Sequence, residues 1–275
     1  MVSTLRTILR YMALLMIGAL MVGPFVWMVS TSMKGPGDIF RYPPQWIPDQ
    51  LNLGNYQTIM AVLPMGRMLL NSFTIAVSAT LGQLLSCSLA AYAFARMKFR
   101  GSAVLYFILL ATMMIPAQVT MIPVFMIMKF VGWIDTLYAL IVPAFFGGAF
   151  GTFLLRQFFS TIPTDLEDAA RIDGCGRFRI FWHIILPLSR PALATLALFS
   201  FMTYWNDLLG PVIYLSSVEK ATLTIGLANL QSGVMTTRYE LLMAGSVLSV
   251  LPILILLIIG QRWFVKGIAL TGLKE

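Results

Sequence analysis

The residues that could do chemistry gather in one short polar segment, residues 164–187, between two long apolar stretches. Asp165, Glu167 and Asp168 follow Thr164 within one turn, where carboxylates offset the positive end of a helix. Threonine followed three residues later by glutamate is the capping-box pattern. The segment therefore predicts a short capped helix over about 165–173 whose carboxylates suit polar contact with another protein.

The end of this predicted helix is marked by Gly174 and Gly176, which can adopt the left-handed backbone that terminates helices. One face of the helix is small and shallow, so another backbone can approach it closely. Spacings of three and four residues place on this face Leu166, Ala169, Ala170 and Asp173.

A second helix is expected to follow over about 177–185. Its apolar residues recur at helical spacing as one stripe, formed by Phe178, Phe181, Trp182 and Ile185. With Arg177 and Arg179 on the polar side, this pattern predicts a helix lying in the membrane interface, ended by Pro187. The alternative is that 164–187 is simply a solvated loop.

Catalytic and metal-binding patterns are otherwise absent from the sequence. His183 is the single histidine and has no Cys, Asp or Glu at ligand spacing, so we expect no metal site. The chain has no phosphate-binding Gly-rich loop, no nucleophile elbow and no paired intramembrane carboxylates. Cys87 falls in a predicted span and Cys175 in the polar segment, so a disulfide is not expected. The chain is therefore predicted not to be an enzyme.

Composition assigns the chain to the membrane. Apolar residues make up 59% and charged residues 11% of its 275 residues, and mean hydropathy is +0.84. The net charge of +8 does not indicate nucleic-acid binding, because Lys and Arg lie at the ends of apolar runs. About 20 apolar residues cross a bilayer. The sequence thus predicts an all-α integral membrane protein, a single domain over 1–275, with six spans at about 11–29, 69–95, 103–128, 136–158, 191–214 and 241–263.

The distribution of basic residues predicts the orientation. One side of this topology carries 13 Lys and Arg and the other carries six. Because the richer side is cytoplasmic, both termini and the 164–187 segment are expected in the cytoplasm. The first apolar run has a basic flank like that of a signal peptide, but its length favours a retained span.

A possible substrate path is indicated by Asp207, the only acidic residue inside the six predicted spans. It follows Arg190 by 17 residues, roughly 25 Å along a helix, which places it near the outer interface. A structural or gating role and direct substrate contact are both open. Its neighbours Tyr204, Trp205 and Asn206 could stack on and hydrogen-bond a sugar, although aromatic residues also favour membrane interfaces.

Residues 168–174, Asp-Ala-Ala-Arg-Ile-Asp-Gly, with Pro187 thirteen residues on, resemble the EAA loop of permease subunits of ATP-binding-cassette (ABC) importers. Further stretches resemble the carbohydrate-uptake branch of that family, the maltose-permease-like proteins, and most of all its shorter six-span partner. They lie at 70–72, 90–96, 115–123, 205–207 and 264–267. The resemblance extends over essentially the whole chain.

This resemblance implies that the 164–187 loop carries a coupling helix that docks into a cytoplasmic ATPase. Asp168 stands where the family usually has Glu, and the neighbouring Glu167 offers a second carboxylate. The expected ATPase-coupling residues are Glu167, Asp168, Ala169, Ala170, Asp173 and Gly174. The implied partners are a second homologous permease, two ATPase subunits that bind ATP and Mg, and an extracytoplasmic solute-binding protein. The chain itself is expected to hold no cofactor.

The function implied is therefore that of a permease subunit of an importer for a sugar or oligosaccharide, in a bacterial or archaeal cytoplasmic membrane. A polyol or glycerol-phosphate-type solute carried by the same mechanism is the alternative. An ion-coupled secondary transporter is less favoured, because one near-interfacial Asp supplies few ion ligands. An integral-membrane enzyme would need clustered carboxylates or histidines.

Overall fold

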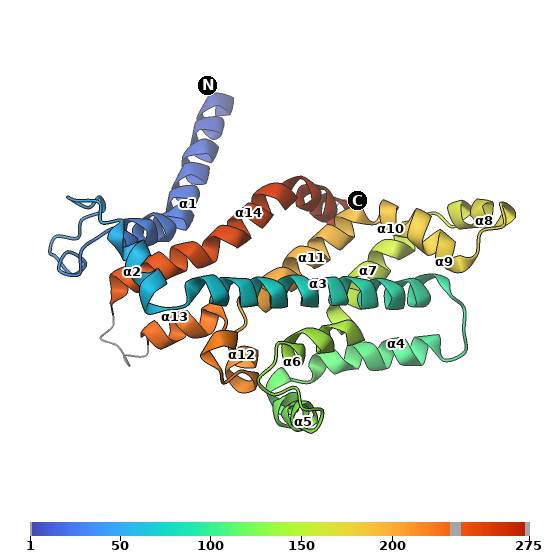
Figure 1. Ribbon diagram of the computed structural model, residues 1–275. Helices are drawn as coiled ribbons and strands as arrows, with labels where there is room; N and C mark the ends of the chain where they lie inside the picture. The colour runs from blue at the N-terminus through green and yellow to red at the C-terminus, as the bar shows by residue number, and fades with distance from the viewer. Residues whose placement is uncertain (1, 232–237, 273–275) are drawn as a thin grey trace. The chain divides into compact units, whose positions relative to one another are not determined.

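The computed structural model describes residues 2–231 and 238–272, with side chains over 5–231 and 238–261. Within these ranges the regular secondary structure is entirely helical (Figure 1). The chain divides into two compact units: Met1–Gly66 with Ile225–Pro252, and Arg67–Thr224 with Ile253–Glu275. The prediction of an all-helical protein with several long apolar helices is confirmed.

The first unit contains the whole of α1 Val2–Ser32 and α2 Gly54–Val62. It also contains most of α13 Leu223–Gln231 and the first part of α14 Tyr239–Gly272. The end of α1 is fixed by polar contacts. The buried amide of Asn55 donates to the carbonyls of Ser32 and Lys34, at 2.9 and 2.8 Å. The ammonium of Lys34 lies 4.0 Å from the centre of the Trp27 ring. These contacts tie the chain after the first span to α2.

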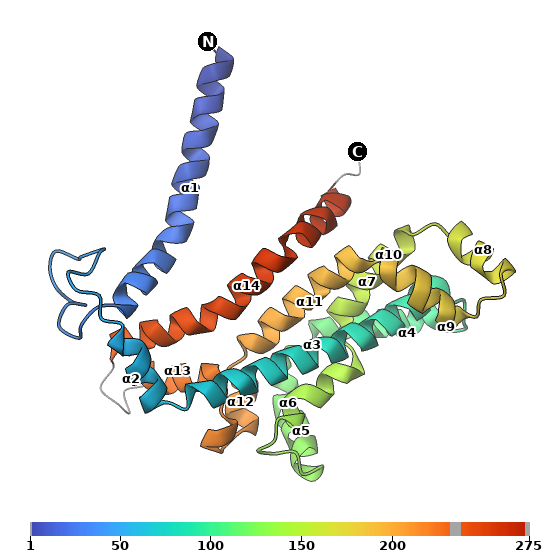
Figure 2. The same cartoon turned by 45° about the horizontal axis from the view of Figure 1, so that its top comes forward.

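The second unit is built around α3 Met65–Arg96, beside which α7 and α11 lie in both views (Figures 1 and 2). Its other elements are α4 Ser102–Ala111, η1 Thr112–Met114, α5 Ala117–Phe130, α6 Tyr138–Ile141, η2 Val142–Phe146, α7 Ala149–Thr161, α8 Asp165–Ile172, α9 Arg177–Ile180, η3 Phe181–Ile185, α10 Leu186–Leu188, α11 Arg190–Trp205, α12 Leu209–Tyr214 and η4 Val218–Lys220. The core of this unit joins α3, α7, η3 and α11 through residues that include Cys87, Leu155, Phe159, Phe181 and Leu196.

Four helices in the described part of the chain are long and apolar enough to cross a membrane: Leu5–Ser32, Met65–Arg96, Tyr138–Thr161 and Tyr239–Gln261. The predicted spans 103–128 and 191–214 are not straight helices. Ser102–Met114 and Ala117–Phe130 meet at 102° within the first of these spans. Arg177–Leu188 meets Arg190–Trp205 at 79°, at a break just before the second. There are six spans only if each bent pair crosses the membrane once.

The break in the third predicted span has a local cause. Pro116 has no amide hydrogen, and its ring disfavours helical geometry in the residue before it. Ile115 accordingly adopts an extended conformation, with φ −86° and ψ 115°. In the fifth predicted span, α11 ends at Trp205, and the short α12 begins only at Leu209. Both predicted spans are thus interrupted, and the six-span topology stays a prediction.

A carboxylate joins the turn before α6 to the segment after α12. Asp135 Oδ1 accepts hydrogen bonds from the amides of Ser216 and Ser217, both at 3.0 Å. Its Oδ2 accepts from the Ser217 hydroxyl and lies 3.1 Å from the Lys220 ammonium. These bonds, those from Ser217 first, hold the pKa of Asp135 well below its usual range. Its backbone has a φ of 56°, a geometry that asparagine also tolerates.

We expect Asp135→Asn to lower the thermal midpoint of the folded protein at pH 7, because the amide keeps the shape but loses the charge. Since the folded-state pKa is depressed, this stabilisation is fully present above the unfolded value of about 4. It is lost as pH falls from there through the folded pKa. The difference between wild type and variant should therefore shrink below about pH 4. Thermal unfolding from pH 3 to 7 measures this.

Asp49→Asn is the matched control for that measurement. Asp49 is another loop carboxylate, but it is largely exposed and lies 3.3 Å from Arg41. Exposed ion pairs contribute little stability. Equal effects of the two variants at pH 7 would contradict the assignment of a structural role to Asp135.

Candidate functional site

The helix predicted in the polar segment is present as α8 Asp165–Ile172, at the end of the second unit where α3 terminates (Figures 1 and 2). It follows α7 after a short connection and precedes α9. Its position is fixed by one buried ion pair. Glu167 Oε1 lies 3.1 Å from Arg96 Nε, and the two side chains are only 3% and 7% exposed.

Arg96 connects three elements at this end. It is the last residue of α3. Its Nη2 donates to the carbonyls of Phe159 and Ile162, at the end of α7. Carbonyls there have no partner within the helix and favour a positive charge. The contact between Arg96 Nε and Glu167 Oε1 is an ion pair without hydrogen-bond geometry. One guanidinium therefore joins α3, α7 and α8.

The N-terminus of α8 differs from the predicted capping box. The Thr164 side chain forms no capping hydrogen bond. Its carbonyl instead accepts from the amides of Glu167 and Asp168, at 2.9 and 3.0 Å. The reciprocal bond is missing because the Glu167 carboxylate is directed to Arg96. The helix boundary was predicted correctly, but the capping box was not.

The C-terminus of α8 is closed by backbone hydrogen bonds around a left-handed glycine. Gly174 has a φ of 77°. Its amide donates to the Arg171 carbonyl at 3.0 Å, and the Cys175 amide donates to the Ala170 carbonyl at 2.9 Å. This pair of bonds is the Schellman motif. Left-handed geometry was predicted correctly for Gly174 and wrongly for Gly176, whose φ is −70°.

The predicted coupling residues divide into an outer and an inner group. Glu167 and Ala170 are buried against the second unit. Asp168 is 61% exposed and pairs with Arg171 at 2.9 Å. Also exposed are Ala169, Asp173 and Gly174.

Sequence reasoning overlooked two residues of this region. Ile172, 88% exposed, is the most exposed large apolar side chain of α8. It lies three residues after Ala169, so helical spacing could have identified it. Arg96 lies far from α8 in the sequence, and no spacing rule links it to Glu167.

The predicted interfacial helix is present in altered form, as α9, a π-helical turn η3 and α10. Its aromatic stripe is split. Phe181 and Ile185 belong to the core, whereas Phe178 and Trp182 are exposed and stack with ring centres 6.3 Å apart. Pro187 lies inside α10, so the predicted stop at this proline was wrong; the break comes at Ser189.

The four residues of the predicted substrate path lie at the break between α11 and α12. Trp205 is buried, with its ring stacked on Phe201 at 5.5 Å. The Tyr204 hydroxyl donates to Gln83 Oε1 at 3.3 Å. The Asn206 amide is exposed and donates to the Met202 carbonyl at 2.9 Å.

Asp207 organises the backbone at this break. Its Oδ1 accepts from the Gly210 amide at 3.2 Å, and its carbonyl accepts from the Thr224 hydroxyl at 2.7 Å. The carboxylate thus accepts a hydrogen bond from a backbone amide at the start of α12. This is a structural role, one of the two that the sequence left open. Among the residues that the structure describes, no three His, Cys, Asp or Glu side chains gather as a metal site.

Comparisons with known proteins agree with this fold. The family of "binding-protein-dependent transport system inner membrane component" proteins matches residues 82–270. The arabinooligosaccharide transport permease AraQ of Halalkalibacterium halodurans is 38% identical over 204 residues, covering 74% of this chain and 72% of its own. The sn-glycerol-3-phosphate transport permease UgpE of Yersinia pestis is 36% identical over 207 residues, covering 74% and 73%.

A solved structure of a bacterial ABC transporter that imports the acidic polysaccharide alginate has a chain of the same fold. Its TM-score is 0.83 at 24% identity, and the match covers 95% of this chain and 97% of that one. The family match and the identities establish that this chain belongs to the binding-protein-dependent transport system inner membrane components, the permease subunits of ABC importers.

Proposed function

We propose that this chain imports a sugar or oligosaccharide and that α8 is the helix that couples it to cytoplasmic ATPase subunits. The observation that carries the proposal is the construction of α8. It is short, exposed along one side and fixed on the other by the buried Glu167–Arg96 pair. A rigid-body motion of an ATPase can pass through such a helix, whereas a slack loop would absorb it.

The exposed side of α8 suits a protein partner. Ala169 and Gly174 permit close approach, and no atom lies within 4 Å of where a Gly174 side chain would begin. Asp168 and Asp173 offer carboxylates, and Ile172 offers an apolar contact at the rim. Glu167 acts from the inner side, because its carboxylate is engaged by Arg96. Asp168 and Asp173 are then the carboxylates of the predicted coupling set that are available to the ATPase.

The rest of the assembly follows from this role. A second permease would complete the path, two ATPase subunits would bind ATP and Mg, and an extracytoplasmic binding protein would deliver the solute. Each bent helix pair would count as one span, which gives six spans. Both termini and α8 would lie in the cytoplasm, in keeping with the 13 basic residues on that side against six on the other.

The cargo is proposed to be a sugar rather than a phosphate-bearing solute. AraQ carries arabinooligosaccharides and UgpE carries sn-glycerol-3-phosphate, so relatives alone allow both. The candidate path residues offer the hydroxyl of Tyr204, the amide of Asn206 and the carboxylate of Asp207. Phosphate is recognised by cationic donors, and a carboxylate repels it. Neutral hydroxyl-rich solutes fit these groups better.

The inner and outer carboxylates of α8 should behave differently. Glu167→Gln leaves the Arg96 guanidinium buried without a counter-charge, and we expect it to cost about 3–5 kcal/mol of stability. Asp168→Asn removes only an exposed pair and should cost less than about 1 kcal/mol, while lowering ATPase stimulation by the loaded binding protein. Thermal unfolding and ATPase assays of the reconstituted importer separate the two effects.

The double variant Arg96→Met with Glu167→Met serves as the control for this pair. Because it leaves no unpaired buried charge, it should be more stable than Glu167→Gln. If Glu167→Gln were as stable as wild type, the ion pair could not be what fixes α8.

A bulky residue at Gly174 should uncouple ATP hydrolysis from uptake. Gly174→Trp forces a side chain into left-handed backbone, at roughly 1–2 kcal/mol, and places bulk on the docking face. Gly174→Asn tolerates that backbone better and should be milder. Gly176→Trp is the matched control, since Gly176 has an ordinary φ of −70° and open space around it. Survival of both transport and stimulated ATPase in Gly174→Trp would refute the docking role of α8.

The cargo is tested by a binding screen of the cognate solute-binding protein against mono- and oligosaccharides, polyols and sn-glycerol 3-phosphate. Micromolar or tighter binding of a saccharide, and saccharide-stimulated ATPase activity of the importer, are expected. Selective binding of the glycerol phosphate would establish the alternative cargo. Ion-driven uptake by the isolated chain would overturn the ABC mechanism itself.

A further inference from the structure

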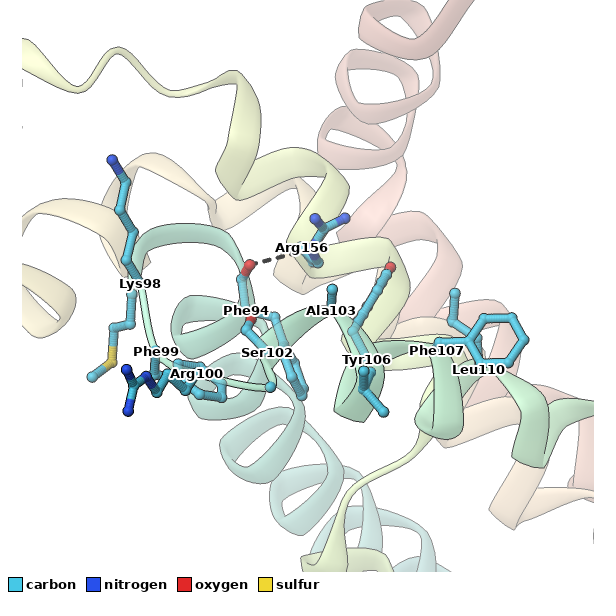
Figure 3. A pocket seen from close by; sticks show the side chains of 13 residues that line it. Phe94, Lys98, Phe99, Arg100, Ser102, Ala103, Tyr106, Phe107, Leu110 and Arg156 are labelled. Carbon is cyan, nitrogen blue, oxygen red and sulfur yellow. Dashed lines mark hydrogen bonds between the residues drawn. The ribbon is translucent and has the colours of Figure 1, made fainter.

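A pocket of about 960 Å³ lies at the turn between α3 and α4, on the second unit. Figure 3 shows its wall: the end of α3 with Phe94, the turn with Lys98 and Arg100, and Tyr106 and Phe107 of α4. Arg156 reaches it from α7. The pocket is separate from the exposed face of α8, and the proposed function assigns nothing to it.

Three cations line this pocket and no acidic residue does. Within the described part of the chain, no carboxylate forms an ion pair with Lys98, Arg100 or Arg156. Arg156 lies 4.2 Å from the centre of the Tyr106 ring and donates to the Phe94 carbonyl at 3.3 Å. The Tyr106 hydroxyl is buried and has no hydrogen-bond partner. Positive charge thus lies along this pocket, and the unpaired Tyr106 hydroxyl is buried in its wall.

Apolar surface continues directly from this basic end. α4 has no buried residue. Its exposed side chains include Val104, Leu105, Phe107 and Ile108. The helix also begins without a side-chain cap, so its first amides add positive potential next to Lys98 and Arg100. The surface is therefore basic at one end and apolar along its length, which is the pattern of an amphiphile with an anionic head.

We propose that this pocket binds one anionic phospholipid of the cytoplasmic leaflet, of the phosphatidylglycerol class. The lipid phosphate sits among Lys98, Arg100 and Arg156, and the acyl chains lie along α4. Basic pockets between membrane helices on the cytoplasmic side bind such headgroups. Two other occupants fit less well. A soluble anion would leave the apolar side of α4 uncovered. An apolar helix of another protein would leave the three cations without counter-charge. The proposal takes only the orientation of the chain from the proposed function.

The test uses the complete purified importer, with lipid binding followed by native mass spectrometry. Phosphatidylglycerol should be retained in preference to phosphatidylcholine, and excess inorganic phosphate should not displace it. Each neutralised cation should weaken binding about five-fold, so the triple variant K98Q/R100Q/R156Q should lose about 100-fold. Arg100 is exposed, so R100Q alone should fold. It should weaken phosphatidylglycerol binding about five-fold, which keeps the test valid if the triple variant does not fold.

The charge-matched control is K129Q/R179Q/R190Q, which removes three cations outside the pocket. It should retain phosphatidylglycerol. Equal loss in both triple variants, or equal retention of phosphatidylcholine, would overturn the proposal. So would cross-linking of a photoreactive group at position 107 to the second permease instead of to lipid. ATPase coupling through α8 is measured on the same samples, so failure of lipid binding and failure of the proposed function are read separately.

Discussion

The geometry of the polar end of this protein depends on one buried ion pair, Arg96–Glu167. Two charges that are almost out of water are costly to separate, because either one alone would remain buried and uncompensated. The pair therefore fixes α8 relative to α3 more strictly than apolar contacts would. Arg96 also holds the last carbonyls of α7. A displacement of α8 must consequently move the ends of two long helices with it.

The helices to which α8 is tied are themselves closely packed. In a bilayer, lipid competes with apolar contacts, so small residues and polar bonds determine how helices associate. Gly151 illustrates this: a Cβ there would lie 2.8 Å from Cys87 Sγ and 3.0 Å from Leu196. The Cys87 sulfur also accepts from the Gly148 amide at 3.3 Å. α3, α7 and α11 are thus joined at short range. If α8 is the coupling helix, as proposed, motion delivered there would pass to these helices rather than be absorbed.

Sequence reasoning recovered the features that depend on local chemistry. The boundaries of α8, the left-handed Gly174 and the apolar helices follow from residue type and spacing alone. Sequence reasoning failed where a residue distant in the sequence determines the contacts that a side chain makes. Glu167 was expected to complete a capping box, but Arg96, at the end of another helix, takes its carboxylate. Phe181 and Ile185 were predicted to lie on one apolar stripe with Phe178. In the structure Phe181 and Ile185 are buried in the core, whereas Phe178 is exposed. At Pro116, the effect of the ring on the preceding Ile115 interrupts the helix.

Broken helices impose a further constraint on the path. Where a helix stops inside a membrane protein, its free amides and carbonyls must find partners, since lipid supplies none. At the break after Trp205, Asn206, Asp207 and Thr224 each bond to backbone groups. The sequence suggests that these polar side chains are available to bind a solute. In the structure some of their hydrogen-bonding groups are already bonded to the backbone. The Tyr204 hydroxyl is likewise bonded, to Gln83 Oε1. If these residues line the path as proposed, few of their polar groups remain for a solute, and discrimination among cargoes would fall chiefly to the proposed binding protein.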